Sequence, residues 1–285
     1  MRRNPMHDSS LAAHREWVDV VDAAYETCSV LVSSCDAYSD LWTPFFNLFW
    51  RNWPDCPYSV YLGTNWAHHD DPRVRTLNAG DDESWSKNLR FFLNQISSEY
   101  VLLLLEDFFL TRHVSTEAVS KHVSALRALN GTSLRLFPNP PPDNRVNGYE
   151  SIGSIHPLAP FRVSAQAGIW KREGLLALLR DDENAWDFER NATARSRTSA
   201  SGFYCTLQPI LPYVHVIEQG RWFWYAARRF QQANIGCNFE ARPVIPAWIA
   251  AKKTARSMMQ GVANRMRNFR MRMETGGDPC HGSRS

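Results

Sequence analysis

Two adjacent carboxylates, Glu106 and Asp107, directly follow residues 100–105, the most hydrophobic run of the chain. Carboxylate oxygens are preferred ligands of Mg²⁺ and Mn²⁺, and one or two of them suffice when phosphate oxygens and water complete the octahedron. A cation held in this way neutralises a diphosphate and stabilises its departure. Because side chains alternate along extended backbone, only one acid faces the ligand easily, and we assign Asp107 to the metal. A second interpretation, that the two acids simply cap a buried strand, remains open.

The elements that must position these acids follow from hydrophobic patterning. Short apolar runs that end in polar residues are typical of buried parallel strands, and segments with apolar residues three and four apart are typical of helices. Ser84 is the expected N-cap of one such helix. The expected strands span residues 29–33, 58–62, 74–77, 100–105, 133–137 and 214–218, with 165–170 a strand or a turn. The expected helices span residues 41–53, 84–96, 116–129 and 173–179, and the proline-rich residues 138–147 are expected to form a loop.

This alternation of strands and helices predicts an α/β fold with a mainly parallel central sheet and helices on both faces. In such sheets, ligands bind beyond the carboxyl ends of the strands. The polar residues that follow three of the expected strands, around Ser34, Asn65 and Asp107, should therefore gather at one edge of the sheet. The sequence predicts a ligand pocket there.

Several segments resemble, in the same order, those of a known family. Residues 104–110 (LLEDFFL), after Ser84-Trp85-Ser86 and Glu99-Tyr100, are similar to the variant DxD region of bacterial GT-A-fold (Rossmann-like) glycosyltransferases of surface-polysaccharide biosynthesis. Residues 164–171 (SAQAGIWK) and 183–189 (ENAWDFE) resemble the acceptor-side segments of that family. Gly220-Arg221-Trp222 and Arg242-Pro243 also match, so the resemblance covers about residues 29–245.

The resemblance implies transfer of a sugar from a nucleotide-sugar donor to a hydroxyl of a bacterial glycan or a lipid-linked acceptor. It also implies a divalent cation, Mn²⁺ or Mg²⁺, bound by Asp107. A full D-x-D is absent, and some enzymes of this fold use basic side chains instead of a cation. An inverting transferase needs a carboxylate to take the proton of the attacking hydroxyl. By analogy this is Glu189 or Asp187, although either could instead cap the following helix.

The resemblance also places the remaining contacts. On the donor side it implies side chains that contact the base, the ribose or the phosphates of the nucleotide. For Trp85, packing in the hydrophobic core is the alternative interpretation. On the acceptor side, flat aromatic rings suit the C–H faces of sugars. The implied donor contacts are Ser34, Asp36, Tyr38, Asn65, Trp85, Glu106 and Asp107, and the implied acceptor contacts are Arg162, Gln166, Trp170 and Trp186.

Composition and the termini narrow the class of protein. A formal net charge of +3 is too small for the field that nucleic-acid binding needs, so no nucleic-acid partner is expected. Acidic residues interrupt the start of the chain, which excludes a secretory signal and favours a cytoplasmic protein.

The expected organisation is an N-terminal helix in residues 1–28, a GT-A domain in 29–245, a basic helical segment in 246–273 and a disordered tail in 274–285. The basic stretch from Lys252 to Arg272 is either a peripheral contact to the anionic inner face of a membrane or a solvated helix.

Two other functions compete with sugar transfer. A sugar-1-phosphate nucleotidyltransferase would use the same donor pocket, but the first strand is followed by Ser34-Cys35-Asp36 and not by a glycine-rich phosphate loop. A non-catalytic carbohydrate-binding protein would explain the eleven tryptophans without any role for the acids.

Overall fold

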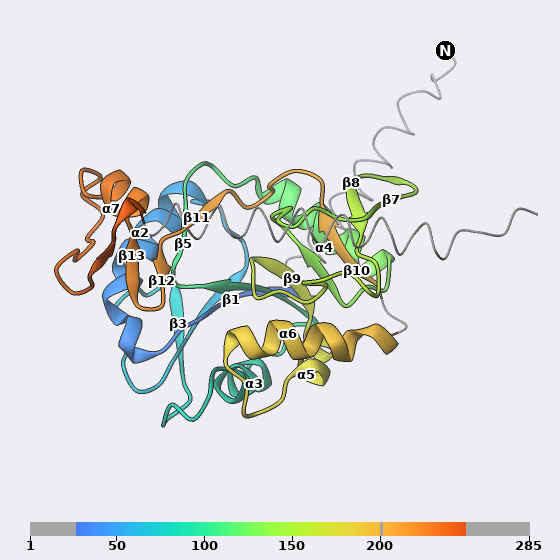
Figure 1. Ribbon diagram of the computed structural model, residues 1–285, viewed down its shortest axis with the longest axis horizontal. Helices are drawn as coiled ribbons and strands as arrows, with labels where there is room; N and C mark the ends of the chain where they lie inside the picture. The colour runs from blue at the N-terminus through green and yellow to red at the C-terminus, as the bar shows by residue number, and fades with distance from the viewer. Residues whose placement is uncertain (1–26, 200–201, 249–285) are drawn as a thin grey trace, which may run out of the picture. The chain divides into compact units, whose positions relative to one another are not determined.

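A computed structural model describes residues 27–199 and 202–248 (Figure 1). The chain divides into two compact units. The described part of the first comprises residues 27–216 and 234–238, and that of the second comprises 217–233 and 239–248. The expected N-terminal helix, nearly all of the basic segment from 246, and the tail lie outside the described residues. Among the described residues, no helix has both the length and the apolar character needed to cross a bilayer.

The first unit is built on a nine-stranded sheet with the order β3-β2-β1-β4-β9-β6-β10-β8-β7. Seven strands point one way, and only β9 and β8 run in the opposite direction. The α/β class and the mainly parallel sheet are therefore confirmed. The strands are β1 (Cys28–Ser33), β2 (Ser59–Thr64), β3 (Val74–Asn78), β4 (Tyr100–Leu105), β6 (Ser133–Arg135), β7 (Asn144–Val146), β8 (Tyr149–Ser154), β9 (Gly168–Lys171) and β10 (Phe203–Thr206).

The parallel register brings the ends of three strands together. Ser33 of β1 lies opposite Gly63 of β2 and Leu105 of β4. Parallel ladders repeat this offset along the whole strand, so the segments that follow β1, β2 and β4 must emerge at one edge. The sequence-based expectation that Ser34 and Asp107 lie at the same end of the sheet is confirmed.

Strand β9 adds a fourth segment to this edge. It is antiparallel to both neighbours, and its first residue, Gly168, lies opposite Leu103 of β4 and Arg135 of β6. The chain before β9 therefore approaches the sheet where β4 ends. Residues 162–167, which contain two of the expected acceptor contacts, reach the edge that carries Asp107.

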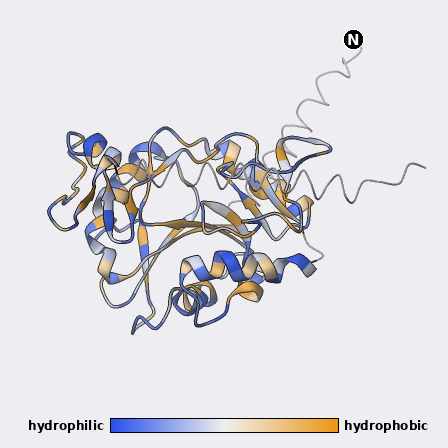
Figure 2. Ribbon diagram, viewed as in Figure 1, coloured by the Kyte–Doolittle hydropathy of each residue, from blue (hydrophilic) through white to orange (hydrophobic). Residues whose placement is uncertain are grey.

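Helices cover both faces of the sheet. In Figure 1, α3 (Trp85–Gln95), α5 (Arg172–Leu178) and α6 (Ala185–Arg195) lie on one face, and α2 (Trp42–Asn52) and α4 (Thr116–Ala128) lie on the other. Side-chain oxygens of Ser84, Ser115 and Asn184 cap the N-termini of α3, α4 and α6. The predicted N-cap of α3, Ser84, is confirmed. Apolar residues concentrate in the central strands, and hydrophilic residues cover much of α6 (Figure 2).

Two expectations about local structure were wrong. Residues 138–147 do not form only a loop, because β7 lies within them and pairs with β8 around Gly148, whose φ is +80°. The strand is exposed and lacks an apolar pattern, so hydrophobicity did not predict it. The single strand expected at 214–218 is two, β11 (Tyr213–His215) and β12 (Ile217–Glu218), which belong to different sheets.

The second unit is small. It contains β12, β13 (Arg221–Phe223), β14 (Val244–Ile245) and α7 (Trp224–Phe230). Strands β12 and β13 form a hairpin around Gly220, whose φ is +73°. Trp222, fully buried, packs on Phe239 with ring centroids 4.9 Å apart and forms the centre of this unit.

Candidate functional site

Asp107 is held beside a histidine from a distant part of the chain. It precedes β5 (Phe108–Leu110), which pairs with β11 so that Phe108 lies opposite His215. The Asp107 carbonyl accepts a hydrogen bond from the Val216 amide at 3.0 Å. His215 Nε2 lies 2.7 Å from Asp107 Oδ2. The other carboxylate oxygen, Oδ1, is buried and accepts no hydrogen bond from the described residues.

At the expected metal position, Asp107 and His215 are two side chains that can bind a divalent cation. A carboxylate oxygen without a partner and an imidazole nitrogen are both ligand types that Mn²⁺ accepts. No cluster of three His, Cys, Asp or Glu suited to a metal occurs in residues 27–199 and 202–248. Asp107 and His215 could therefore hold a cation only together with oxygens from a ligand and water. Sequence reasoning missed His215, because only the pairing of β5 with β11 brings it to Asp107.

Glu106 lies near the loop that follows β1. It is buried, at 8% exposure. Burial, with the carboxylates of Glu106 and Asp82 adding to it, raises the pKa of the Cys35 thiol to about 11. Glu106 therefore lies near the segment after β1, while Asp107 contacts β11. The alternation that assigned only one of the two acids to the metal is consistent with these two environments.

Asp36 and Asn65 bind each other across the ends of β1 and β2. The Asp36 amide donates to Asn65 Oδ1 at 3.1 Å, and Asp36 Oδ1 accepts from the Asn65 amide at 3.0 Å. The Asp36 carboxylate also accepts from the amides of Trp66 and Ala67. These bonds shape the rim of the sheet edge, and a role for Asp36 or Asn65 in donor contact stays a prediction.

Three other expected donor contacts occupy different environments. Ser34 Oγ accepts a hydrogen bond from the Trp42 indole at 2.8 Å, and Tyr38 is half-buried in the 3₁₀ helix η1 (Asp36–Leu41). Trp85 packs on Phe188 with ring centroids 5.3 Å apart, which favours the core interpretation. The rim instead exposes Trp66, at 65%. This ring was not singled out from sequence, since nothing local distinguishes it from ten other tryptophans.

Glu189 faces the loop that leads into β9. Its Oε1 accepts hydrogen bonds from Ser164 Oγ at 2.7 Å and from the Ala165 amide at 2.8 Å. Among the described residues no hydrogen bond to Oε2 is made. Burial raises the pKa of Tyr213, and the carboxylates of Asp107 and Glu189 add to the effect, so both acids lie near this one phenol.

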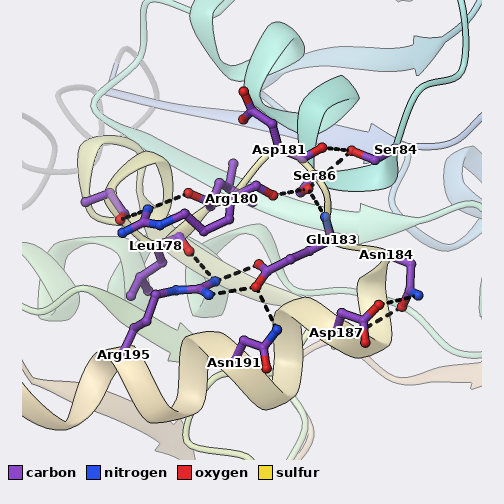
Figure 3. Close-up of polar contacts among 12 residues, drawn as sticks. Ser84, Ser86, Leu178, Arg180, Asp181, Glu183, Asn184, Asp187, Asn191 and Arg195 are labelled. Atoms are coloured by element: carbon purple, nitrogen blue, oxygen red, sulfur yellow. Dashed lines mark hydrogen bonds and ion pairs between the residues drawn. The ribbon is translucent and has the colours of Figure 1, made fainter.

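Asp187 is bound by Asn184, the N-cap residue of α6. The Asp187 amide donates to Asn184 Oδ1 at 3.0 Å, and Asn184 Nδ2 donates back to Asp187 Oδ2 at 2.5 Å (Figure 3). Arg190, one turn further on, forms an ion pair with the same carboxylate. The structure therefore separates the two candidate bases: Asp187 completes a cap, and Glu189 faces the sheet edge.

An ion pair between Arg195 and Glu183 joins the last residue of α6 to the turn that precedes the helix. Arg195 donates to both oxygens of Glu183, at 2.7 and 2.6 Å, and Asn191 adds a third hydrogen bond (Figure 3). The hydrogen bonds from Arg195 lower the pKa of Glu183. Backbone and side-chain bonds between Glu183 and Ser86 then join this turn to α3. The network places α6, and with it Glu189, relative to the helical layer.

The four expected acceptor contacts do not form one surface. Arg162 and Trp170 are buried, at 4% and 2% exposure, and with Gln166 they line a cavity of about 10 Å³, too small for a sugar. Arg162 lies over the Phe203 ring, 4.3 Å from its centroid. Only Trp186 is open to solvent, at 56%. In this conformation Arg162 and Trp170 are closed off from solvent, and their role in acceptor contact stays a prediction. Sequence did not predict their burial, because no local pattern distinguishes a buried from an exposed tryptophan.

Comparisons with known proteins give a low level of similarity. No family model and no curated protein matches the chain. Among solved structures, S. aureus TarS 1–349 in complex with UDP aligns with a TM-score of 0.45 and 13% identity, over 66% of this chain and 59% of that one. The apo-form glycosyltransferase GlyE of Streptococcus pneumoniae TIGR4 aligns with a TM-score of 0.36 and 12% identity, over 78% of this chain and 55% of that one. The chain thus spans a little over half the length of these proteins.

Proposed function

We propose that this chain is a nucleotide-sugar-dependent glycosyltransferase. One observation supports the proposal: the register of β1, β2 and β4 brings Ser34, Asn65 and Asp107 to one edge, and the loop that binds Glu189 enters β9 at that edge. The proposed donor site and the proposed base would therefore share one end of the sheet. Such an arrangement suits a reaction in which a diphosphate leaves on one side and a hydroxyl attacks from the other.

On the donor side, Asp107 and His215 are the residues that would hold a divalent cation. A bound cation would supply neutralisation of the diphosphate and stabilisation of the leaving group. Asp107 Oδ1 accepts no hydrogen bond from the described residues, and the His215 side chain beside it is partly exposed, so the pair has ligand atoms to offer to a cation. Trp66 offers an exposed ring at the same rim.

On the acceptor side, Glu189 is the proposed base. In the reaction, the acceptor oxygen forms a bond to the anomeric carbon, the bond from that carbon to the diphosphate breaks, and Glu189 takes the hydroxyl proton. Ser164 and Ala165 orient Oε1 and leave Oε2 for the proton. Attack from the side opposite the leaving group gives inversion. Trp186, three residues before Glu189 on α6, lies on the same helical face and provides a platform for the acceptor sugar.

The acceptor itself is proposed to be a glycan or lipid-linked sugar hydroxyl, as the family resemblance implies. The basic stretch from Lys252 to Arg272 would suit a lipid-linked acceptor, since it carries seven basic residues and no acid.

The test is a thermal-shift screen of nucleoside diphosphates with and without Mn²⁺, followed by a donor hydrolysis assay. A glycosyltransferase should be stabilised by one diphosphate in a Mn²⁺-dependent manner and should slowly hydrolyse the matching nucleotide-sugar. A nucleotidyltransferase would instead form nucleotide-sugar from a nucleoside triphosphate and a sugar-1-phosphate. A carbohydrate-binding protein would respond to sugars alone, and either result would refute the proposal.

A further inference from the structure

The second unit exposes aromatic and basic side chains on one face of α7. Trp224 and Tyr225 are exposed at 38% and 39%, and Arg228 and Arg229 are also exposed. Ala226 and Phe230, by contrast, are buried. At 100° per residue, the four exposed positions fall within about 140° of the helix circumference, and the two buried ones lie opposite. The helix thus has one face packed into its unit and one face of aromatic rings followed by guanidinium groups.

The surroundings of α7 extend the same chemistry. Val244 of β14 and Trp248 are exposed at 43% and 63%. The described part of the second unit has four arginines, Arg221, Arg228, Arg229 and Arg242, against two acids, Glu218 and Glu240. The chain then continues into residues 249–272, which include seven Lys or Arg and no acid. The whole chain has a formal net charge of only +3, whereas residues 249–272 alone carry seven positive charges. The positive charge of the protein is therefore concentrated at this end of the sequence.

We propose that the exposed face of α7, defined by Trp224, Tyr225, Arg228 and Arg229, docks on an anionic lipid surface. Trp and Tyr rings prefer the boundary between the headgroups and the acyl chains, because one part of each ring is apolar and the other can hydrogen-bond. Arginine pairs with phosphate in a bidentate manner. A protein partner binds such rings in a shaped pocket, whereas a lipid surface requires only a small face that carries both aromatic rings and positive charges.

The test is flotation of the full-length protein with vesicles of phosphatidylcholine, with and without 30% phosphatidylglycerol. No nucleotide-sugar is present, so the outcome is independent of the proposed catalytic function. Binding to the anionic vesicles is expected, with little binding to phosphatidylcholine alone. Arg228→Gln combined with Arg229→Gln should weaken binding roughly 25-fold at low salt, which is about fivefold for each arginine. Trp224→Ala should weaken it at low and high salt alike, because ring insertion is not screened by ions.

Matched controls come from the first unit. Phe91, exposed at 39%, is replaced by Ala, and the exposed Arg112 and Arg145 are replaced by Gln; neither variant should change flotation. A further variant neutralises Arg265, Arg267, Arg270 and Arg272. The proposal is overturned if the protein does not bind anionic vesicles, or if the α7 variants bind like the wild type while only the 265–272 variant loses binding. Loss in the α7 variants, with or without loss in the latter, supports it.

Discussion

The sheet edge around β1, β2 and β4 and the segment from Phe161 through α6 hold their carboxylates in different ways. At the sheet edge, the parallel ladder fixes where each strand ends, and backbone amides bind Asp36 directly. Around α6, side chains contribute more: Glu189 accepts from Ser164 Oγ as well as from the Ala165 amide, and Glu183 is bound by Arg195. The sheet edge is therefore positioned mainly by the backbone, whereas α6 also depends on side-chain contacts that single substitutions can remove.

This difference predicts separable defects. If Asp107 holds a cation as proposed, Asp107→Asn should abolish the Mn²⁺-dependent thermal shift and lower kcat/KM on the order of 10³-fold, because the cation would lose its charged ligand while the sheet stays intact. Thermal-shift titration and initial rates measure the two effects. Asp70→Asn, in an exposed loop, is the matched control. An unchanged response to Mn²⁺ would remove Asp107 from the site.

Glu189→Gln should produce the complementary defect. Turnover should fall about 10² to 10³-fold because the amide cannot take the acceptor proton, while diphosphate and Mn²⁺ binding stay unchanged. The amide oxygen can still accept from Ser164, so the fold should be kept. Rapid-quench or steady-state rates at saturating donor measure kcat. Loss of diphosphate binding in this variant would contradict the separation of the two halves.

The ion pair beneath α6 should show itself in stability and its dependence on pH. The lowered pKa of Glu183 means that its contribution is present above its usual value of 4.5 and is lost as pH falls through the lower folded value. Glu183→Gln should therefore reduce the free energy of unfolding by about 2 kcal/mol at pH 7, because Arg195, whose side chain is 23% exposed, is left partly buried without a charge partner. Urea unfolding at pH 7 and at pH 4 or below measures this. The gap between variant and wild type should narrow as the pH falls, and a gap that is constant with pH would rule out the ionic origin.

How far the sequence predicted the molecule follows the same division. Strand β4 and the N-cap of α3 were predicted at the residue level, because an unbroken apolar run and a serine before a helix are local patterns. The shared edge for Ser34 and Asp107 followed from topology. His215 could not be found, since its position depends on β11 pairing with β5 across more than 100 residues. Trp170 and Trp66 show the same limit: both are tryptophans, and only tertiary packing makes one buried and the other exposed.

The smallest expected effect separates the two acids of α6. Asp187→Asn removes the charge that Arg190 pairs with and that favours the helix N-terminus, but the new amide can keep one capping bond. The loss should be about 1 kcal/mol, or a Tm lower by roughly 2–4 °C, with turnover within twofold of the wild type. Thermal unfolding and kcat measured on one preparation decide the matter. If turnover instead falls a hundredfold while Glu189→Gln stays active, the base is Asp187, and the acceptor hydroxyl must approach the exposed start of α6 and not the loop at Ser164.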